Sequence, residues 1–124
     1  MSKILVIDDD AIVRTSIVLL LVDAGYQVLS AENGALGMAL YRSEQPDLVV
    51  TDIIMPEQEG IQTITEIRKV RPDAKIIAIS GGARLGHADF LKIALVLGAM
   101  AAVPKPFDQD ELLTLVKDCL ARHA

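Results

Sequence analysis

Short apolar runs alternate along the chain with longer amphipathic segments, and glycine, proline, asparagine or aspartate marks each change. Apolar runs of about five residues bounded by turn residues predict buried strands, and the longer segments predict helices. The expected strands are residues 4–7, 27–30, 48–51, 75–79 and 101–103. The expected helices are residues 11–24, 34 to just before Pro46, from after Gly60 to about 70, roughly 87–97, and from Asp108 to the C-terminus.

Two sequence signals mark the ends of these helices. Gly25 stands where a left-handed cap would close the first helix. Asp108, with Glu111 three residues on, forms a capping-box pattern that opens the last one.

Five successive strand–helix units predict an α/β fold. Such alternation gives a parallel sheet with right-handed crossovers and helices on both faces. Residues 1–124 contain no linker, low-complexity segment or longer repeat, so we expect one domain. The common five-stranded order is 2-1-3-4-5, the flavodoxin-like doubly wound sheet, whose switch point lies between strands 1 and 3. The ends of these two strands should therefore lie side by side.

The composition narrows the class of protein. With 52% apolar and 23% charged residues, the chain is not expected to be disordered, and its net charge of −5 disfavours direct nucleic-acid binding. A single cysteine, Cys119, excludes an intrachain disulfide and suits a reducing compartment. Strand-like sequence from Lys3 leaves no room for a signal peptide, and the apolar run 17–22 is too short to span a bilayer. We expect a soluble, cytoplasmic protein with no membrane insertion.

Three carboxylates are expected to meet at the switch point. Asp8 and Asp9 end the first strand and Asp52 ends the third. Two carboxylates about 4 Å apart repel by about 4 kcal/mol at an effective dielectric near 20, so the cluster should hold a proton or bind a cation. Oxygen ligands without histidine or cysteine favour Mg²⁺ over zinc. The alternative is that Asp52 caps the next turn or helix and that Asp10 caps the first helix.

Two further polar residues end the remaining strands. Ser80 follows strand 4, and its hydroxyl could bond a phosphoryl oxygen. Lys105 follows strand 5 between Pro104 and Pro106, and its ammonium could reach a dianion. Alone, each would be read as an ordinary turn serine or loop lysine. Because the ends of strands 1, 3, 4 and 5 converge, the combined set predicts a phosphoryl site.

The chain resembles the receiver domain of bacterial two-component response regulators, the family that includes the single-domain chemotaxis regulator. The resemblance covers essentially the whole sequence and implies the same five-stranded fold. The residues that carry it are residues 4–10, Asp52 with Met55-Pro56 and Gly60, Ser80, Gly98-Ala99, and Lys105-Pro106-Phe107.

The resemblance implies a metal site and a phosphoacceptor. It assigns Asp52 as the phosphoacceptor and Asp9, Asp52 and the backbone carbonyl of Ile54 as Mg²⁺ ligands. Asp8 would act mostly through a bound water.

The resemblance also assigns roles around the phosphoryl group. Ser80 would contact it through the hydroxyl, Lys105 would pair with it as a cation, and the Lys105-Pro106 peptide would be cis. Attack by Asp52 on phosphorus would give an acyl phosphate that water can hydrolyse. We therefore expect a switch that catalyses only its own modification, rather than a turnover enzyme.

The expected phosphodonor is a sensor histidine kinase or a histidine phosphotransfer protein. The expected output is a downstream protein partner or effector domain that binds the face formed by helix 4, strand 5 and helix 5. A homodimer is left open.

Two features depart from the family pattern. Ala102 occupies the strand 5 position where an aromatic switch residue is usual, and Ser80 and Lys105 are 25 residues apart, with the extra length in residues 81–86. The signal is therefore predicted to pass through residues 81–90 and helix 4, the alternative being that these residues form only a surface loop. His87 and His123 are interpreted as surface residues.

Two other functions compete with the phosphorelay receiver. One is a receiver-fold interaction module that binds a partner without phosphorylation, which the intact acid, hydroxyl and lysine set disfavours. The other is an aspartate-nucleophile phosphatase. Residues 52–55 supply no second acid two positions after Asp52, and no substrate cap is present, so this function is disfavoured as well.

Overall fold

A five-stranded parallel sheet lies at the centre of the computed structural model, which describes residues 2–53, 59–80, 92, 95–96, 98–104 and 107–122. The strands lie in the order β2-β1-β3-β4-β5, which confirms the predicted fold class and strand order. Their bounds are β1 (Lys3–Ile7), β2 (Gln27–Ala31), β3 (Leu48–Asp52), β4 (Ile76–Ser80) and β5 (Ala101–Pro104).

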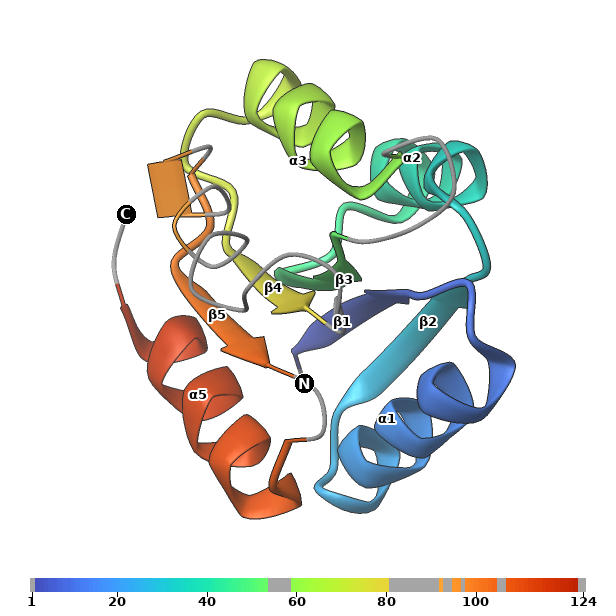
Figure 1. Ribbon diagram of the computed structural model, residues 1–124, viewed down its shortest axis with the longest axis vertical. Helices are drawn as coiled ribbons and strands as arrows, with labels where there is room; N and C mark the ends of the chain where they lie inside the picture. Colours follow the sequence, from blue (N-terminus) through green and yellow to red (C-terminus); the bar gives the residue numbers. More distant parts are fainter. Residues whose placement is uncertain are drawn as a thin grey trace.

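Helices cover both faces of this sheet. Helices α1 and α5 lie on one side and α2 and α3 on the other (Figure 1). Within the described part of the chain, no helix has the length and apolar character needed to cross a membrane. The helix bounds are α1 (Ala11–Asp23), α2 (Gly34–Glu44), α3 (Glu59–Val70) and α5 (Gln109–Ala121).

The helix predicted at about 87–97 falls mostly outside the described residues. Lys92, Leu95 and Val96 are described, and all three are helical. The extent of that helix stays a prediction.

Most element bounds differ from the sequence prediction by one residue because partners on neighbouring strands set where pairing stops. Asp52 is the last residue of β3 and pairs with Ile79, and Ser80 ends β4 opposite Pro104 rather than opening a loop. The start of the third helix was predicted two residues too late, because α3 begins at Glu59 and not after Gly60. A glycine is tolerated in a first helical turn, where the N–H groups have no intrahelical acceptor in any case.

Helix ends agree with the sequence signals. Asp10 is the N-cap of α1, and its carboxylate accepts a hydrogen bond from the Ile12 N–H at 2.9 Å. Gly25 has a φ of 98°, the left-handed conformation predicted for it. Asp108 is the N-cap of α5 and accepts from the Asp110 N–H at 2.8 Å. The caps therefore fix where the chain enters α1 and α5.

Alternate residues of each strand build two separate hydrophobic cores. In β1, Leu5 and Ile7 belong to the core under α2 and α3, whereas Ile4 and Val6 belong to the core under α1 and α5. Every residue of β3 is buried, as expected for a central parallel strand. β1 and β3 are therefore closed to solvent along nearly their whole length.

Helix α2 approaches β1 closely at one glycine. A Cβ atom added at Gly37 would lie 2.5 Å from Cδ1 and 2.9 Å from Cγ1 of Ile7, a fully buried side chain. The absence of a side chain at Gly37 thus sets the distance between α2 and the strand that leads to Asp8.

We predict that Gly37→Ala destabilises the protein. Crowding of a packed core costs about 1–3 kcal/mol, and the better helix propensity of alanine offsets about 1 kcal/mol of that. The expected net loss is about 1 kcal/mol in the free energy of unfolding, measured by urea denaturation. Ile7→Val removes the clashing Cδ1 atom, so the double variant should lose less than the sum of the single variants. Strict additivity would contradict this packing account.

Candidate functional site

Three carboxylates meet at the carboxyl ends of β1 and β3. The two strands are neighbours, with Ile7 paired to Thr51, so the residues that follow lie side by side. One carboxylate oxygen from each of Asp8, Asp9 and Asp52 lies within 4.8 Å of the others. The structure thus brings together the three acids that the sequence placed at the switch point.

The three acids differ in exposure. Asp8 is fully buried and Asp52 is 3% exposed, whereas Asp9 is exposed at the rim. Even at the full 4.8 Å, two carboxylates repel by about 3.5 kcal/mol at an effective dielectric of 20. An ion or molecule that relieves this repulsion must approach along the strand axis, because the strands are covered on both faces.

The turn between β1 and α1 holds Asp8 in place through several hydrogen bonds. Its N–H donates to the Ala31 carbonyl at 3.2 Å, and its Oδ1 accepts from the Asp10 N–H at 2.9 Å. A guanidinium nitrogen of Arg14 donates to the Asp8 carbonyl at 2.8 Å. The apolar pattern does not predict this last contact. Its one sequence signal is a cation in the first turn of a helix, where the helix dipole disfavours positive charge.

Capping in this turn falls to Asp10, which accepts from the N–H groups of Ile12 and Val13. The alternative interpretation of the acidic run therefore holds for Asp10. The carboxylates of Asp8 and Asp9 reach the cluster instead.

The donor set fits Mg²⁺. Mg²⁺ prefers oxygen ligands at about 2.1 Å in an octahedron, so opposite ligands are about 4.2 Å apart. The oxygens of the three acids, all within 4.8 Å of one another, need to move by about 1 Å to reach octahedral positions around one ion. Asp8, Asp9 and Asp52 are therefore the residues that could hold such an ion.

The remaining predicted site residues are described only in part. Ser80 ends β4 and pairs with Pro104 at the end of β5. The carboxyl ends of β4 and β5 therefore lie on the same side of the sheet as Asp52. Ile54, Lys105 and the Lys105-Pro106 peptide lie outside the described residues. Their assigned roles stay predictions.

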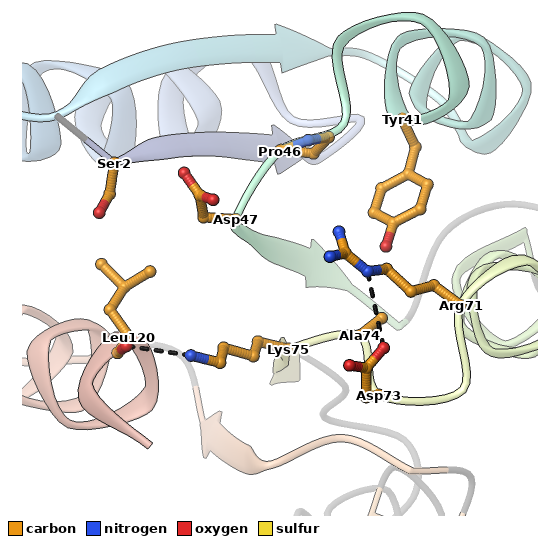
Figure 2. Close-up of a pocket in the computed structure, with 9 residues that line it drawn as sticks. All are labelled: Ser2, Tyr41, Pro46, Asp47, Arg71, Asp73, Ala74, Lys75 and Leu120. Atoms are coloured by element: carbon orange, nitrogen blue, oxygen red, sulfur yellow. Dashed lines mark hydrogen bonds and ion pairs between the residues drawn. The ribbon is translucent and has the colours of Figure 1, made fainter. Parts of the chain in front are cut away.

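A cavity of about 210 Å³ lies at the amino ends of the strands, where Asp47 precedes β3 and Lys75 precedes β4. Figure 2 shows the Tyr41 hydroxyl pointing toward Arg71 across this cavity. Burial raises the pKa of Tyr41, and the positive charge of Arg71 partly offsets that effect. Lys75 Nζ donates to the Leu120 carbonyl at 3.0 Å, which ties β4 to α5. These contacts join secondary-structure elements far from the acid cluster.

A family model described as the response regulator receiver domain matches residues 4–117. The chain belongs to this family. Receiver domains are signalling modules of two-component systems, and the acid cluster of this receiver domain lies at the carboxyl ends of its strands.

Individual relatives of the chain are response regulators too. The receiver domain is 37% identical over 119 residues to the chemotaxis protein CheY of Bacillus subtilis, covering 95% of this chain and 97% of CheY. It is 38% identical over 119 residues to the DNA-binding transcriptional regulator NtrC of Azospirillum brasilense, covering 96% of this chain but 24% of NtrC. A solved response regulator receiver domain protein from Clostridium thermocellum superimposes with a TM-score of 0.88 at 30% identity, over 97% of this chain and 94% of the other.

Ala102, which stands where the family usually has an aromatic residue, lies beside another small side chain. Ala102 is half-buried, packs against the core under α2 and α3, and pairs with the buried Ala78 of β4. Two methyl groups therefore lie next to each other on this face of the sheet. Residues 81–91 lie outside the described part of the chain, so the predicted signal path through them stays a prediction.

We predict that Mg²⁺ raises the melting temperature of the receiver domain and that Asp9→Asn reduces this rise. A ligand at about 100 times its Kd stabilises the folded state by about 2.7 kcal/mol. In EDTA, the variant should melt at a higher temperature than the wild type, because one of the repelling charges is gone. Thermal unfolding with and without Mg²⁺ measures both effects.

The matched control is Asp23→Asn, which removes one negative charge at the far end of α1. Its Mg²⁺-dependent rise should equal that of the wild type. An equal rise in Asp9→Asn and Asp23→Asn would rule out Asp9 as a ligand.

Proposed function

We propose that this receiver domain accepts a phosphoryl group on Asp52 from a sensor histidine kinase or histidine phosphotransfer protein. The phosphorylated domain would then change its contacts with a downstream partner or effector domain through the helix 4, β5 and α5 face. The observation that supports this most directly is the position of the Asp52 carboxylate. It is 3% exposed, within 4.8 Å of two further carboxylates, at the carboxyl end of β3.

The chemistry follows from a buried carboxylate next to a cation site. An Asp52 oxygen attacks phosphorus, the bond from phosphorus to the donor nitrogen breaks, and an acyl phosphate forms. Mg²⁺ held by Asp8, Asp9 and Asp52 would supply positive charge that offsets the charge on the phosphoryl oxygens. Ser80 and Lys105 are proposed to bond the same oxygens. Attack of water on phosphorus returns the free Asp52 carboxylate.

The surface beside the acid cluster suits a protein donor. Ile12, in the first turn of α1, is 79% exposed, and Leu19, two turns further along the same side, is 64% exposed. Exposed apolar side chains beside a buried reactive group are typical of a docking surface. A helical donor could cover this side of α1 while its phosphohistidine reaches Asp52.

We predict that the wild type gains the mass of one phosphoryl group on incubation with acetyl phosphate and Mg²⁺. Asp52→Asn should show no gain, because an amide cannot act as the nucleophile, and EDTA should suppress the gain in the wild type. Intact-mass spectrometry measures each state, and Asp23→Asn serves as the control that should behave as the wild type. No gain in the wild type would overturn the proposal and favour an interaction module that acts without phosphorylation.

A second prediction separates donor docking from chemistry. Ile12→Asp should slow transfer from a phosphorylated histidine kinase by on the order of tenfold, because a charge replaces a central apolar contact. A kinase found by screening for transfer to the wild type serves as donor. Phosphorylation by acetyl phosphate should be unchanged in this variant.

The matched control for docking is Val70→Asp, in the last turn of α3 on the other face of the sheet and 50% exposed. It should leave both transfer rates unchanged. Equal slowing in the two variants, or slowing with acetyl phosphate as well, would count against docking at the first turn of α1.

A further inference from the structure

Arg14 occupies an electrostatically unfavourable position in its helix. Helix α1 contains two charged residues, Arg14 near its start and Asp23 at its end, and no acid lies in its first turn. The N-terminus of a helix carries partial positive charge, so this arrangement opposes the helix dipole. A helical side chain leans toward the N-terminus of its own helix, which directs Arg14 back to the β1–α1 turn.

The guanidinium of Arg14 reaches the backbone of the acid cluster. It is half-buried and donates to the Asp8 carbonyl oxygen at 2.8 Å. Asp8 is fully buried, so this bond forms where water competes poorly. A guanidinium group has N–H donors and no acceptor, so the side chain can only donate here.

The acceptor is the carbonyl that leads into Asp9. The Asp8 carbonyl and the Asp9 N–H belong to one planar peptide unit, so fixing the carbonyl also fixes the direction in which the chain enters Asp9. The Asp8 N–H is held separately by the Ala31 carbonyl, and its carboxylate Oδ1 accepts from the Asp10 N–H. The Arg14 contact adds the peptide between the two acids to the groups that are held.

We propose that Arg14 is a positioning residue for the cation site. By holding the peptide plane between Asp8 and Asp9, it sets the geometry in which their carboxylates meet Mg²⁺. The inference rests on the proposed function, because it concerns the same site. The bond from Arg14 ends on the Asp8 backbone carbonyl, so this contact itself takes up no carboxylate oxygen.

Two effects of Arg14 on Mg²⁺ binding have opposite signs. Its positive charge repels the cation, so removing the charge alone would tighten binding. Its hydrogen bond orders the ligands, so removing the bond would weaken binding. Groups that orient metal ligands typically change metal affinity by about 10–100-fold, so we expect the loss of order to dominate.

The test is a Mg²⁺ titration of the unphosphorylated full chain, followed by amide shifts in NMR spectra. Arg14→Met should bind Mg²⁺ about tenfold more weakly than the wild type. Arg14→Lys keeps a cationic donor and should retain most of the affinity. Arg42→Met removes the same charge from the last turn of α2, away from the acid cluster, and should titrate as the wild type.

Unchanged or tighter binding in Arg14→Met would overturn the proposal, as would a lower melting temperature with no change in Mg²⁺ affinity. If Arg14→Met does not fold, Arg14→Lys and Arg14→Gln decide the question in the same titration. The positioning role predicts that the Lys variant binds Mg²⁺ at least as tightly as the Gln variant. Tighter binding by the neutral Gln variant would mean that charge governs, and would reject the proposal.

The same proteins distinguish this inference from the proposed function. The titration needs no phosphoryl transfer, so a wild type that binds Mg²⁺ but gains no phosphoryl mass would refute only the proposed function. A wild type that is phosphorylated while Arg14→Met keeps full Mg²⁺ affinity would refute only the role of Arg14.

Discussion

Repulsion between carboxylates at the ends of two neighbouring parallel strands is the constraint on which this structure depends. The acids do not meet because they attract one another; they meet because β1 and β3 pair in one register, with Ile4 opposite Leu48 and Ile7 opposite Thr51. A slip by one residue would turn the buried side chains of a strand to the opposite face, so the two cores hold the register in place. Apolar burial thus opposes a local repulsion that would otherwise push the strand ends apart.

The two ends of the strands therefore carry different kinds of interaction. The amino ends are joined by attractive contacts, such as the bond from Lys75 to the Leu120 carbonyl, and the carboxyl ends carry the unfavourable charge. The close approach of α2 at Gly37 presses on Ile7, directly before Asp8, so tight packing begins one residue from the acids. A rigid support lets small movements of the carboxylates, rather than of the strands, respond to a cation or a phosphoryl group.

The sequence predicts the strands, their order and the meeting of Asp8, Asp9 and Asp52, because all three depend on chain-local patterns and on one topological rule. It does not predict the last residue of each strand, since pairing with a neighbour decides whether Ser80 ends β4 or begins a loop. Nor does it predict the contact from Arg14 to Asp8, because that contact depends on how far a side chain reaches back over a turn. Ile54 and Lys105 lie outside the described residues, so the role of Ile54 rests on the family resemblance alone and that of Lys105 on the resemblance and its place after strand 5.

The burial of Asp52 also affects how long a phosphoryl group would stay on it. A carboxylate that is 3% exposed offers water little access, yet hydrolysis of an acyl phosphate needs a water in line with the bond that breaks. On the proposed chemistry, whatever lies over the carboxyl ends of the strands decides how often such a water reaches the phosphorus. The burial of Asp52 would then help to set the lifetime of its acyl phosphate. A partner that covers the strand ends would lengthen that lifetime and so prolong the signal that it receives.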